Sequence, residues 1–251
     1  MRAVRKFIDL NIKLSMRFDK LFFPPSFHVD GNNEFSIDMV PTYLKNGIKI
    51  YDVGGGKNPF LNIDQKIVLG LYVVGIDISQ KELDLAPIGS YDEVVCADIA
   101  SFKGNCDGDL VICQAVLEHV RDVDGAFRSI ASLLRPGGTA LIFVPSRNAV
   151  FAKINLFLPQ KLKEKILYGI FPSTQAAQGF PSFYNKCTPN AFRVLMKDNG
   201  FREIEVRYYF VSAYFTFFFP LHFAWRIWIL FFRCLRGGQA AETFSMALVK
   251  K

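Results

Sequence analysis

Cysteine and histidine are scarce in this sequence of 251 residues, which holds five cysteines and three histidines. The cysteines are dispersed, no two of them form a Cys-x-x-Cys pair, and no histidine cluster lies beside them. This pattern argues against a zinc motif and a disulfide framework, and it is typical of free thiols in a reducing compartment. We therefore expect no metal site.

Signals for secretion and for hydride transfer are also missing. Asp9 and Lys13 interrupt the apolar stretch at the N-terminus, so the stretch does not read as a secretory signal. The sequence contains no Tyr-x-x-x-Lys pair of the short-chain dehydrogenase kind. Gly54-x-Gly56 lacks the third glycine of a dinucleotide fingerprint, and Pro59 follows where a helix should pack closely. A dehydrogenase is therefore disfavoured.

The net charge of +7 favours an anionic partner, and 26 phenylalanines give the chain an unusual aromatic content. Nucleic acid and an anionic membrane are both compatible with that charge. The basic residues accompany amphipathic segments, however, and no helix-turn-helix, aromatic RNA platform or basic tail is visible. We expect no nucleic-acid partner.

Short strands rich in Val and Ile alternate with helix-length segments from Lys49 to Val144. They read IKIYDV, YVVGIDI, EVVCADI, DLVICQAV and ALIFVP. Such runs predict parallel strands buried on both faces, with ligands at their carboxyl ends. A helix capped by Thr188 and ending at Gly200, the strand FREIEVRYY and a final strand TFSMALVKK follow. The predicted fold is α/β, a doubly wound, mostly parallel seven-stranded sheet with amphipathic helical additions.

Acidic residues and glycines recur where the predicted strands end. Asp52 precedes Gly54, Gly55 and Gly56, Asp77 ends the second strand, and Asp98 ends the third. The stretch DLVICQAVLEHV follows as a fourth strand and helix, and LLRPGGTALIFVP as the turn into the fifth strand. This ordered set resembles the class I S-adenosylmethionine (SAM) methyltransferases, in particular the methyltransferase type 11 or ubiquinone/menaquinone methyltransferase-like branch, over roughly residues 48–147.

The resemblance implies SAM as cofactor and a role for each of these positions. The three glycines leave room for the methionine moiety, and Asp77, with Ile78 beside it, accepts hydrogen bonds from the ribose hydroxyls. Asp98 receives the adenine amino group while the Ile99 N–H faces the ring, and Gln114 faces the methyl group or the SAM amino group. Asp52 either binds the cofactor directly or caps the glycine loop. Asn58 departs from the family pattern, which often has a third glycine there.

The catalytic residue is less well specified than the cofactor site. Methyl transfer by direct displacement needs alignment, and a general base only for a hydroxyl or acidic-carbon acceptor. His119 is the candidate base, and the alternative is a hydrogen-bonded structural histidine in a helix under the sheet. Glu118 is expected in a salt bridge, and Ser146, Arg147 and Asn148 are candidate acceptor contacts.

Three apolar segments lie outside the sheet pattern. They are an amphipathic N-terminal extension (1–30), preceding the methyltransferase domain at 31–251, and insertions at 149–185 and 208–238 within that domain. The run 208–225 is marginal for a bilayer crossing, at about 27 Å against a core of ~30 Å. The strands before and after it should also pair in one sheet. We expect an in-plane or re-entrant arrangement, or a lid or dimer interface. In the first case Arg226 and Arg233 would lie at the lipid interface among Trp225, Trp228 and Phe231.

The sequence thus predicts a SAM-dependent methyltransferase acting on a small or amphiphilic acceptor, such as a lipid-linked saccharide or isoprenoid. It would be cytoplasmic, peripheral or monotopic on the inner membrane face. The alternative is a degenerate, non-catalytic SAM-fold scaffold on the membrane. The sequence does not specify the oligomeric state.

Overall fold

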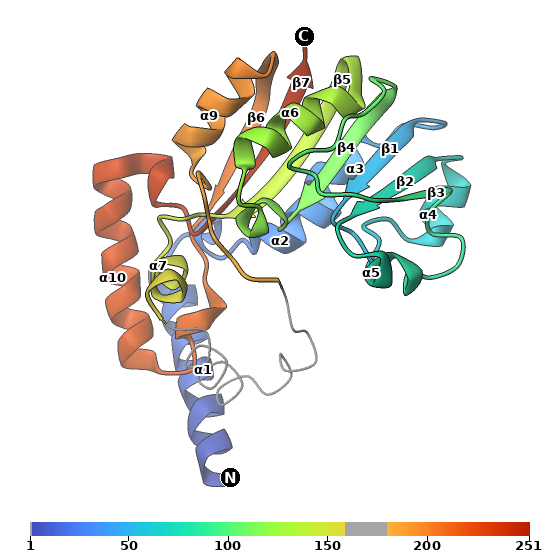
Figure 1. Ribbon diagram of the computed structural model, residues 1–251. Coiled ribbons are helices and arrows are strands. Elements are labelled where there is room, and N and C mark those ends of the chain that lie inside the picture. The colour runs from blue at the N-terminus through green and yellow to red at the C-terminus, as the bar shows by residue number, and fades with distance from the viewer. Residues whose placement is uncertain (1, 159–179) are drawn as a thin grey trace.

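The computed structural model describes residues 2–158 and 180–251, and a seven-stranded sheet forms its centre (Figure 1). The strand order is β3-β2-β1-β4-β5-β7-β6. The strands are β1 Lys49–Val53, β2 Tyr72–Asp77, β3 Glu93–Cys96, β4 Gly108–Gln114, β5 Leu134–Pro145, β6 Phe201–Tyr209 and β7 Thr243–Lys250. β1 to β5 are parallel, and β7 is antiparallel to both β5 and β6. The predicted fold class is confirmed.

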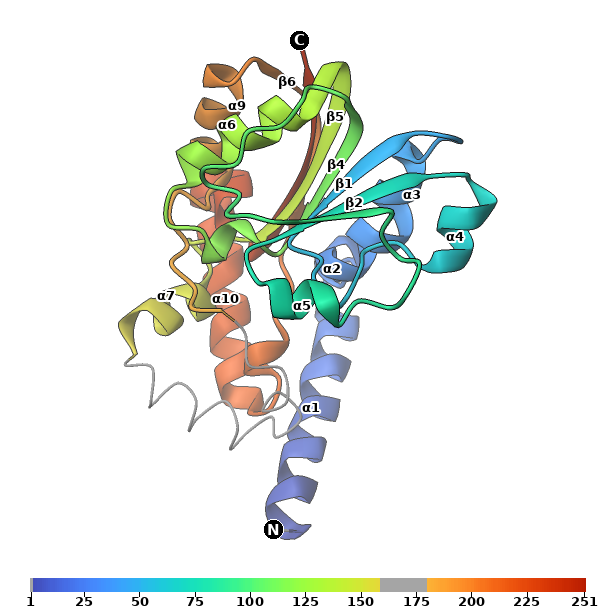
Figure 2. The same ribbon diagram turned by 45° about the vertical axis from the view of Figure 1, so that its right-hand side comes forward.

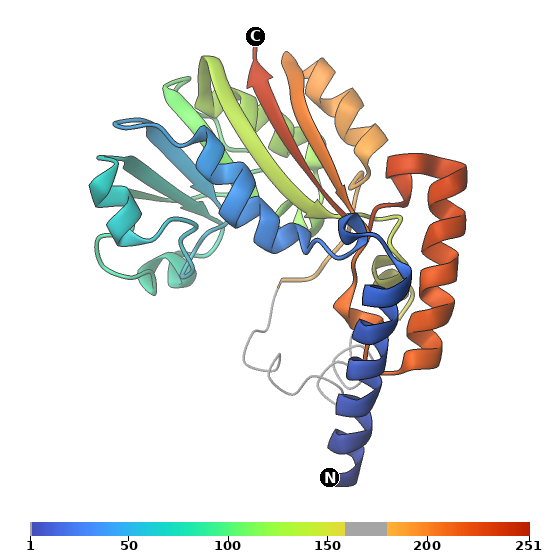
Figure 3. The ribbon, with the colours of Figure 1, turned by 180° about the vertical axis from the view of Figure 1, so that it is seen from behind.

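Helices cover both faces of the sheet. One face carries α6 (Val123–Leu133) and α9 (Pro189–Asp198), whose apolar side chains join the larger core cluster. The other carries α2 (Gly31–Glu34), a π-turn and α3 (Val40–Tyr43), which run together across the sheet in Figure 3. The short helices α4 (Ile63–Val68) and α5 (Gln80–Asp84) flank β2.

The predicted helix at 189–200 is confirmed with its caps. The Thr188 hydroxyl accepts a hydrogen bond from the Ala191 N–H at 3.3 Å, and Pro189 occupies the first helical position. Gly200 follows the helix with φ +74°, a conformation that glycine adopts without steric cost.

The expectation that all parallel strands are buried on both faces is wrong for β3. β3 forms the edge of the sheet, and three of its four residues are exposed. An edge strand pairs on one side only, so it has no second neighbour to enclose it. The apolar pair Val94-Val95 in the sequence does not distinguish an edge strand from a central one.

Two long helices stand beyond the edge at which the parallel strands end (Figures 1 and 2). They are α1 (Arg2–Phe22) and α10 (Phe219–Arg236), which pack against each other with α7 (Val150–Phe157) nearby. β6 continues to Tyr209, so the later insertion starts at residue 210, inside the predicted 208–238. KLKEKILYGIF, the predicted amphipathic stretch at 161–171, lies outside the described residues.

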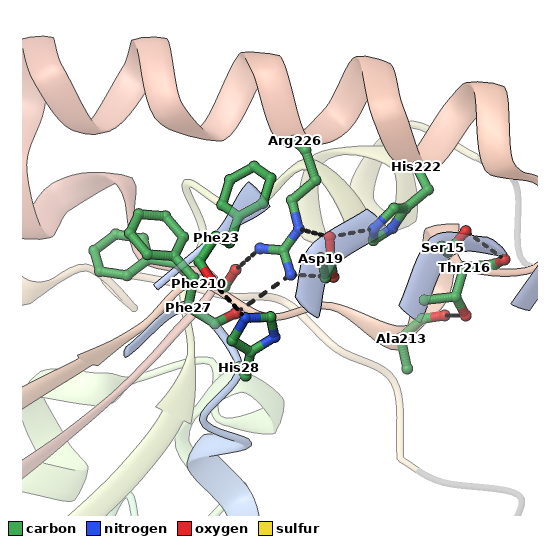
Figure 4. A network of polar contacts seen from close by, with 10 residues as sticks. All are labelled: Ser15, Asp19, Phe23, Phe27, His28, Phe210, Ala213, Thr216, His222 and Arg226. Carbon is green, nitrogen blue, oxygen red and sulfur yellow. Dashed lines mark hydrogen bonds and ion pairs between the residues drawn. The ribbon is translucent and has the colours of Figure 1, made fainter. Parts of the chain in front are cut away.

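A buried charge network joins α1 to α10 (Figure 4). The Arg226 guanidinium donates to both carboxylate oxygens of Asp19, and His222 Nε2 lies 2.8 Å from the same carboxylate. Burial alone would raise the pKa of Asp19, but the hydrogen bonds from His222 and Arg226 outweigh it and lower that pKa. Arg226 also donates to the Phe210 and Phe27 carbonyls, so each of its three nitrogens has at least one acceptor.

Part of the sequence interpretation of this segment is therefore wrong. Trp225 and Arg226, expected at the lipid interface, are 4% and 1% exposed. Arg233 lies over the rings of Phe27 and Phe210 at 4.7 and 4.9 Å. The helical period turns these residues toward α1, and a nearly continuous apolar run conceals that side from sequence inspection.

Asp19→Leu should lower the free energy of unfolding by about 3 kcal/mol, because it leaves the Arg226 charge buried without a partner. The double variant Asp19→Leu/Arg226→Met removes that charge and should be less destabilised than Asp19→Leu alone. Urea denaturation measures both. Asp84→Asn, at an exposed carboxylate on α5, is the control and should change stability by less than about 0.5 kcal/mol. A loss below ~1 kcal/mol for Asp19→Leu would show that the network does not hold the helices together.

Candidate functional site

The glycine loop after β1 is closed too tightly for side chains. Gly54 and Gly56 have φ of +77° and +48°. A Cβ on Gly55 would lie 2.3 Å from Asp52 Oδ2, and one on Gly54 would lie 2.3 Å from Val116 Cγ2. Asn58 has no left-handed backbone; its N–H donates to the Gly55 carbonyl at 2.9 Å. The missing third glycine is therefore not required by the backbone of this loop.

Asp52 lies under the loop with 4% of its surface exposed. Its Oδ2 accepts hydrogen bonds from the Phe60 N–H at 2.8 Å and the Tyr91 hydroxyl at 3.1 Å. Burial raises the pKa of Asp52 to about 6, although both hydrogen bonds act to lower it. Of the two predicted roles, this geometry corresponds to loop capping. Tyr91, which sequence reasoning missed, is part of that cap.

Asp77 ends β2 directly beside the glycine loop. Its Oδ1 accepts from the Ser79 N–H at 2.9 Å, and its Oδ2 faces Gly56, where a Cβ would lie 2.9 Å away. Burial raises the pKa of Asp77. Ile78, next in the chain, is exposed on this edge. The glycine loop and Asp77, which the sequence analysis assigned to one cofactor site, thus lie next to each other.

Asp98 and Ile99 follow β3 on the same edge of the sheet. The Asp98 side chain is exposed and accepts from the Ala100 N–H at 2.8 Å, which forms a short turn. Ile99 buries its side chain in the core, with 6% exposed. This anchoring holds the turn after β3 at the sheet edge, next to the turn after β2.

Gln114, at the end of β4, is held by a segment that sequence reasoning did not connect to the site. Its Nε2 donates to Asn32 Oδ1 at 2.9 Å and Ser36 Oγ at 3.1 Å. Arg207 of β6 fixes this segment through Glu34 and Asp38. The N-cap Asp30, which accepts from the Asn32 N–H at 2.9 Å, is the signal that marks the start of this helix in the sequence. The chain before β1 therefore forms one wall of the site.

His119 lies in a short 3-10 turn, Leu117–His119, and not in the expected helix, because α6 begins only at Val123. Its Nδ1 is 3.1 Å from the Pro181 carbonyl, and burial lowers the pKa of His119. The contact with Pro181 matches the structural alternative, and a role as base stays a prediction.

Glu118 does not form the expected salt bridge. It is 4% exposed, and among the described residues the basic group within 4 Å of its carboxylate is His119 Nε2 at 3.8 Å, which forms an ion pair only when the imidazole is protonated. Burial raises the pKa of Glu118 to about 8, so its carboxyl is largely protonated at pH 7. Sequence cannot show this, because the residues that bury Glu118 come from distant segments.

The three residues after β5 separate into structural and accessible positions. Ser146 is fully buried and its hydroxyl accepts from the Asn148 N–H at 3.1 Å, while Asn148 Nδ2 donates to the Gln239 carbonyl at 2.9 Å. Arg147 is exposed. Of the candidate acceptor contacts, only Arg147 presents its side chain to solvent at this edge.

Tyr91→Phe should lower the free energy of unfolding by about 1 kcal/mol by removing a hydrogen bond to Asp52. The folded state raises the pKa of Asp52 from its ordinary value of 3.8 to about 6, so the ionisation of Asp52 costs stability as the pH rises between these two values. The hydroxyl stabilises the ionised form, so the variant should lose more at pH 8 than at pH 5. Urea denaturation at both pH values measures this, and Tyr72→Phe, at a half-exposed ring, is the control. An equal loss at both pH values would contradict the role of Tyr91.

Comparisons with known proteins agree with this geometry. Residues 33–206 match the family described as "Methyltransferase domain". A ubiquinone biosynthesis O-methyltransferase of Cupriavidus pinatubonensis is 31% identical over 168 residues, 64% of this chain and 63% of that protein. The protein of the same name in Chromobacterium violaceum is 31% identical over 125 residues, 47% of this chain and 53% of that protein. The chain thus spans about half to under two thirds of these relatives.

A solved structure shows the same architecture. The SAM-dependent methyltransferase of Mesorhizobium loti superposes with a TM-score of 0.56 at 18% identity, covering 88% of this chain and all of the other. At that identity the likeness concerns the fold alone. Because the family match covers well over half of the sequence, the chain belongs to the methyltransferase-domain family, with the class I SAM-dependent methyltransferase fold that its motifs predicted.

Proposed function

We propose that this protein is a SAM-dependent methyltransferase whose acceptor is an amphiphilic molecule at a membrane surface. The observation that carries the enzymatic part is the contact between the glycine loop and the second acid, since Gly56 lies against Asp77 Oδ2. This edge of the sheet carries the carboxylates of Asp77 and Asp98, whereas a dinucleotide-binding site would need groups that bind a pyrophosphate there. A sulfonium cation suits such a cleft.

The chemistry of the side chains at this edge suits the cofactor. Asp77 would hold the ribose hydroxyls, Asp98 the adenine amino group, and the glycine loop the methionine moiety. Gln114, oriented by Asn32 and Ser36, would face the sulfonium end. When bound, SAM supplies an activated methyl group, and the protein's task is to align the acceptor with it.

Glu118 and His119, which follow the end of β4, carry no positive charge near neutral pH. Burial raises the pKa of Glu118 to about 8, so near neutral pH most of this carboxyl is protonated. Because that pKa lies close to neutral pH, the carboxyl could both release and accept a proton. Burial lowers the pKa of His119, which keeps the imidazole neutral. Neither residue repels the sulfonium, and alignment then carries most of the rate enhancement.

The amphiphilic acceptor is proposed from the outer surface of α1 and α10. Large apolar side chains on both helices are exposed, among them Phe7 (54%), Phe22 (70%), Trp228 (42%) and Phe231 (57%). Exposed basic residues alternate with them on α1: Arg5, Lys6, Lys13, Arg17 and Lys20. Among the described residues no helix is long and apolar enough to span a bilayer. Such a surface favours binding in the interface of an anionic membrane.

We place the outer surface of α1 and α10 on the cytoplasmic face of the membrane. The five free cysteines support a reducing compartment. A lipid-linked saccharide or an isoprenoid would reach the site from that membrane, because α1 and α10 stand beyond the same sheet edge as the glycine loop (Figure 2).

Titration calorimetry with S-adenosylhomocysteine tests the cofactor site. The wild type should bind in the micromolar range, and Asp77→Ala should weaken binding by about 1–3 kcal/mol through loss of a buried hydrogen-bonding group. Gly56→Ala should abolish binding, since its Cβ would meet Asp77 Oδ2 and Glu82 Cβ at a φ of +48°. Gly70→Ala, at a positive φ with open space around it, is the control for backbone strain. A wild type that binds no S-adenosylhomocysteine would refute the enzymatic proposal.

Transfer of labelled methyl groups from SAM to extracted membrane lipids and glycans distinguishes the enzyme from the non-catalytic scaffold. The enzyme gives a labelled product, and mass spectrometry then shows a shift of one methyl group. A scaffold binds the cofactor and labels nothing.

Trp228→Ser with Phe231→Ser should weaken binding to anionic vesicles at least tenfold. Each half-exposed side chain offers roughly 1–2 kcal/mol of apolar burial in the interface. Vesicle co-sedimentation measures the change, and binding of S-adenosylhomocysteine should stay unaltered. Val68→Ser with Ile88→Ser removes two exposed apolar residues elsewhere and is the matched control.

Each failure of the vesicle experiment has a distinct meaning. If the Trp228/Phe231 variant still sediments like the wild type, another segment is the anchor. If the wild type does not bind anionic vesicles, the membrane contact and the lipid-linked acceptor are refuted. The proposed cofactor site does not depend on that result.

A further inference from the structure

A cavity of about 290 Å³ lies past the ends of β4 and β5, apart from the glycine loop. It is lined by Arg121, Val123, Asp124, Arg147, Asn185 and Lys186. Its size is at the lower end of small-molecule pockets, which start near 300 Å³. It suits one polar group of a ligand.

The lining carries uncompensated positive charge. Lys186 Nζ lies 2.7 Å from the Asp124 carboxylate, so this pair neutralises itself. Arg121 and Arg147 have no carboxylate within 4 Å among residues 2–158 and 180–251. The Asp124 carboxylate also lines the cavity but is paired with Lys186, so Arg121 and Arg147 leave the lining with a net positive charge that a ligand anion would offset.

The two arginines are held in place by one segment, residues 183–187. The Arg121 guanidinium lies 4.6 Å from the centre of the Phe183 ring, and the Asn185 side chain donates to the Arg121 carbonyl at 3.0 Å. The backbone N–H of Arg147 donates to the Cys187 carbonyl at 2.7 Å, and the Arg147 guanidinium donates to the Tyr184 carbonyl at 3.4 Å. Restraint before binding reduces the entropy lost on binding.

We infer that this cavity binds a phosphate or diphosphate group of the methyl acceptor. A guanidinium group presents paired N–H donors that match the oxygens of a phosphate. Two guanidinium groups together favour a ligand with two negative charges over a ligand with a single carboxylate. β1, β4 and β5 are neighbours in the sheet, so the turn after β5, which carries Arg147, lies about two strand spacings, roughly 10 Å, along the edge from the glycine loop. That spacing fits an acceptor methylated at an atom remote from its phosphate.

The identity of the ligand as methyl acceptor rests on the proposed function, whereas anion binding does not. Calorimetry with inorganic pyrophosphate at low salt should show saturable binding by the wild type. Arg121→Gln and Arg147→Gln should each weaken it about tenfold or more, the loss of one charge-assisted hydrogen-bonded contact. Arg128→Gln removes an exposed cation of α6 that does not line the cavity, and should change binding less than twofold.

Two results would overturn the site. One is a wild type that binds S-adenosylhomocysteine but no pyrophosphate; this leaves the cofactor proposal intact. The other is pyrophosphate binding that Arg121→Gln and Arg147→Gln do not weaken, or that malonate, a dicarboxylate, equals in affinity.

Two further arms identify the source of the phosphate. Phosphatidylcholine vesicles with and without a polyisoprenyl diphosphate test a lipid-linked group, and a soluble nucleoside diphosphate sugar tests a free one. Arg147-dependent binding to the diphosphate vesicles supports the site on a lipid-linked acceptor. Arg147-dependent binding of the soluble compound alone supports the site and assigns it to a free phosphorylated substrate.

Discussion

β7 is hydrogen-bonded on both sides, to β5 and to β6, and this pairing decides where the apolar part of the chain can go. The chain leaves the sheet after Tyr209 and must come back to the same edge at Thr243. The Glu242 N–H donates to the Tyr209 carbonyl, and the Glu242 carbonyl accepts from the Ser146 N–H, both at 2.8 Å. Trp225 then donates to the buried Glu242 carboxyl at 3.2 Å, which ties α10 to this closure. The insertion is therefore anchored at the edge where the parallel strands end, the same edge of the sheet that carries the glycine loop.

The helices α1 and α10 divide their side chains between two environments. Their inner faces share the Asp19, His222 and Arg226 network, in which each charge has a partner, because an unpaired charge would be costly there. Their outer faces keep large apolar and basic side chains in solvent. A helix pair stabilised by internal ion pairing can keep its shape while presenting an apolar surface. This arrangement is compatible with the membrane-binding surface proposed for the outer faces of the two helices.

The carboxyl edge of the sheet differs in electrostatic character from one half to the other. Around β1, β2 and β3 it presents Asp77 and Asp98, with Asp52 beneath the loop, a setting that favours a cationic cofactor. Around β4 and β5 it presents Arg121 and Arg147, a setting that favours an anion. Opposite preferences side by side would orient a cationic donor and an anionic acceptor on one edge. Gln114 ends β4, the strand between the two halves, and Asn32 and Ser36 hold it there.

The sequence by itself determined the parallel strands, the helix after Thr188, the family and the ordered acids, since these depend on local apolar patterns and on residues fixed to strand ends. It also determined that the strands before and after the segment 208–238 pair in one sheet. Only the tertiary structure decided that Asp52 caps the loop, that Tyr91, Asn32 and Ser36 support the site, and that β3 is an exposed edge. It likewise decided that Trp225 and Arg226 are buried, that Glu118 stays largely protonated, and that Arg121 and Arg147 border one cavity. These features depend on contacts between residues far apart in the chain, and neither hydrophobic period nor motif spacing encodes which distant partners meet.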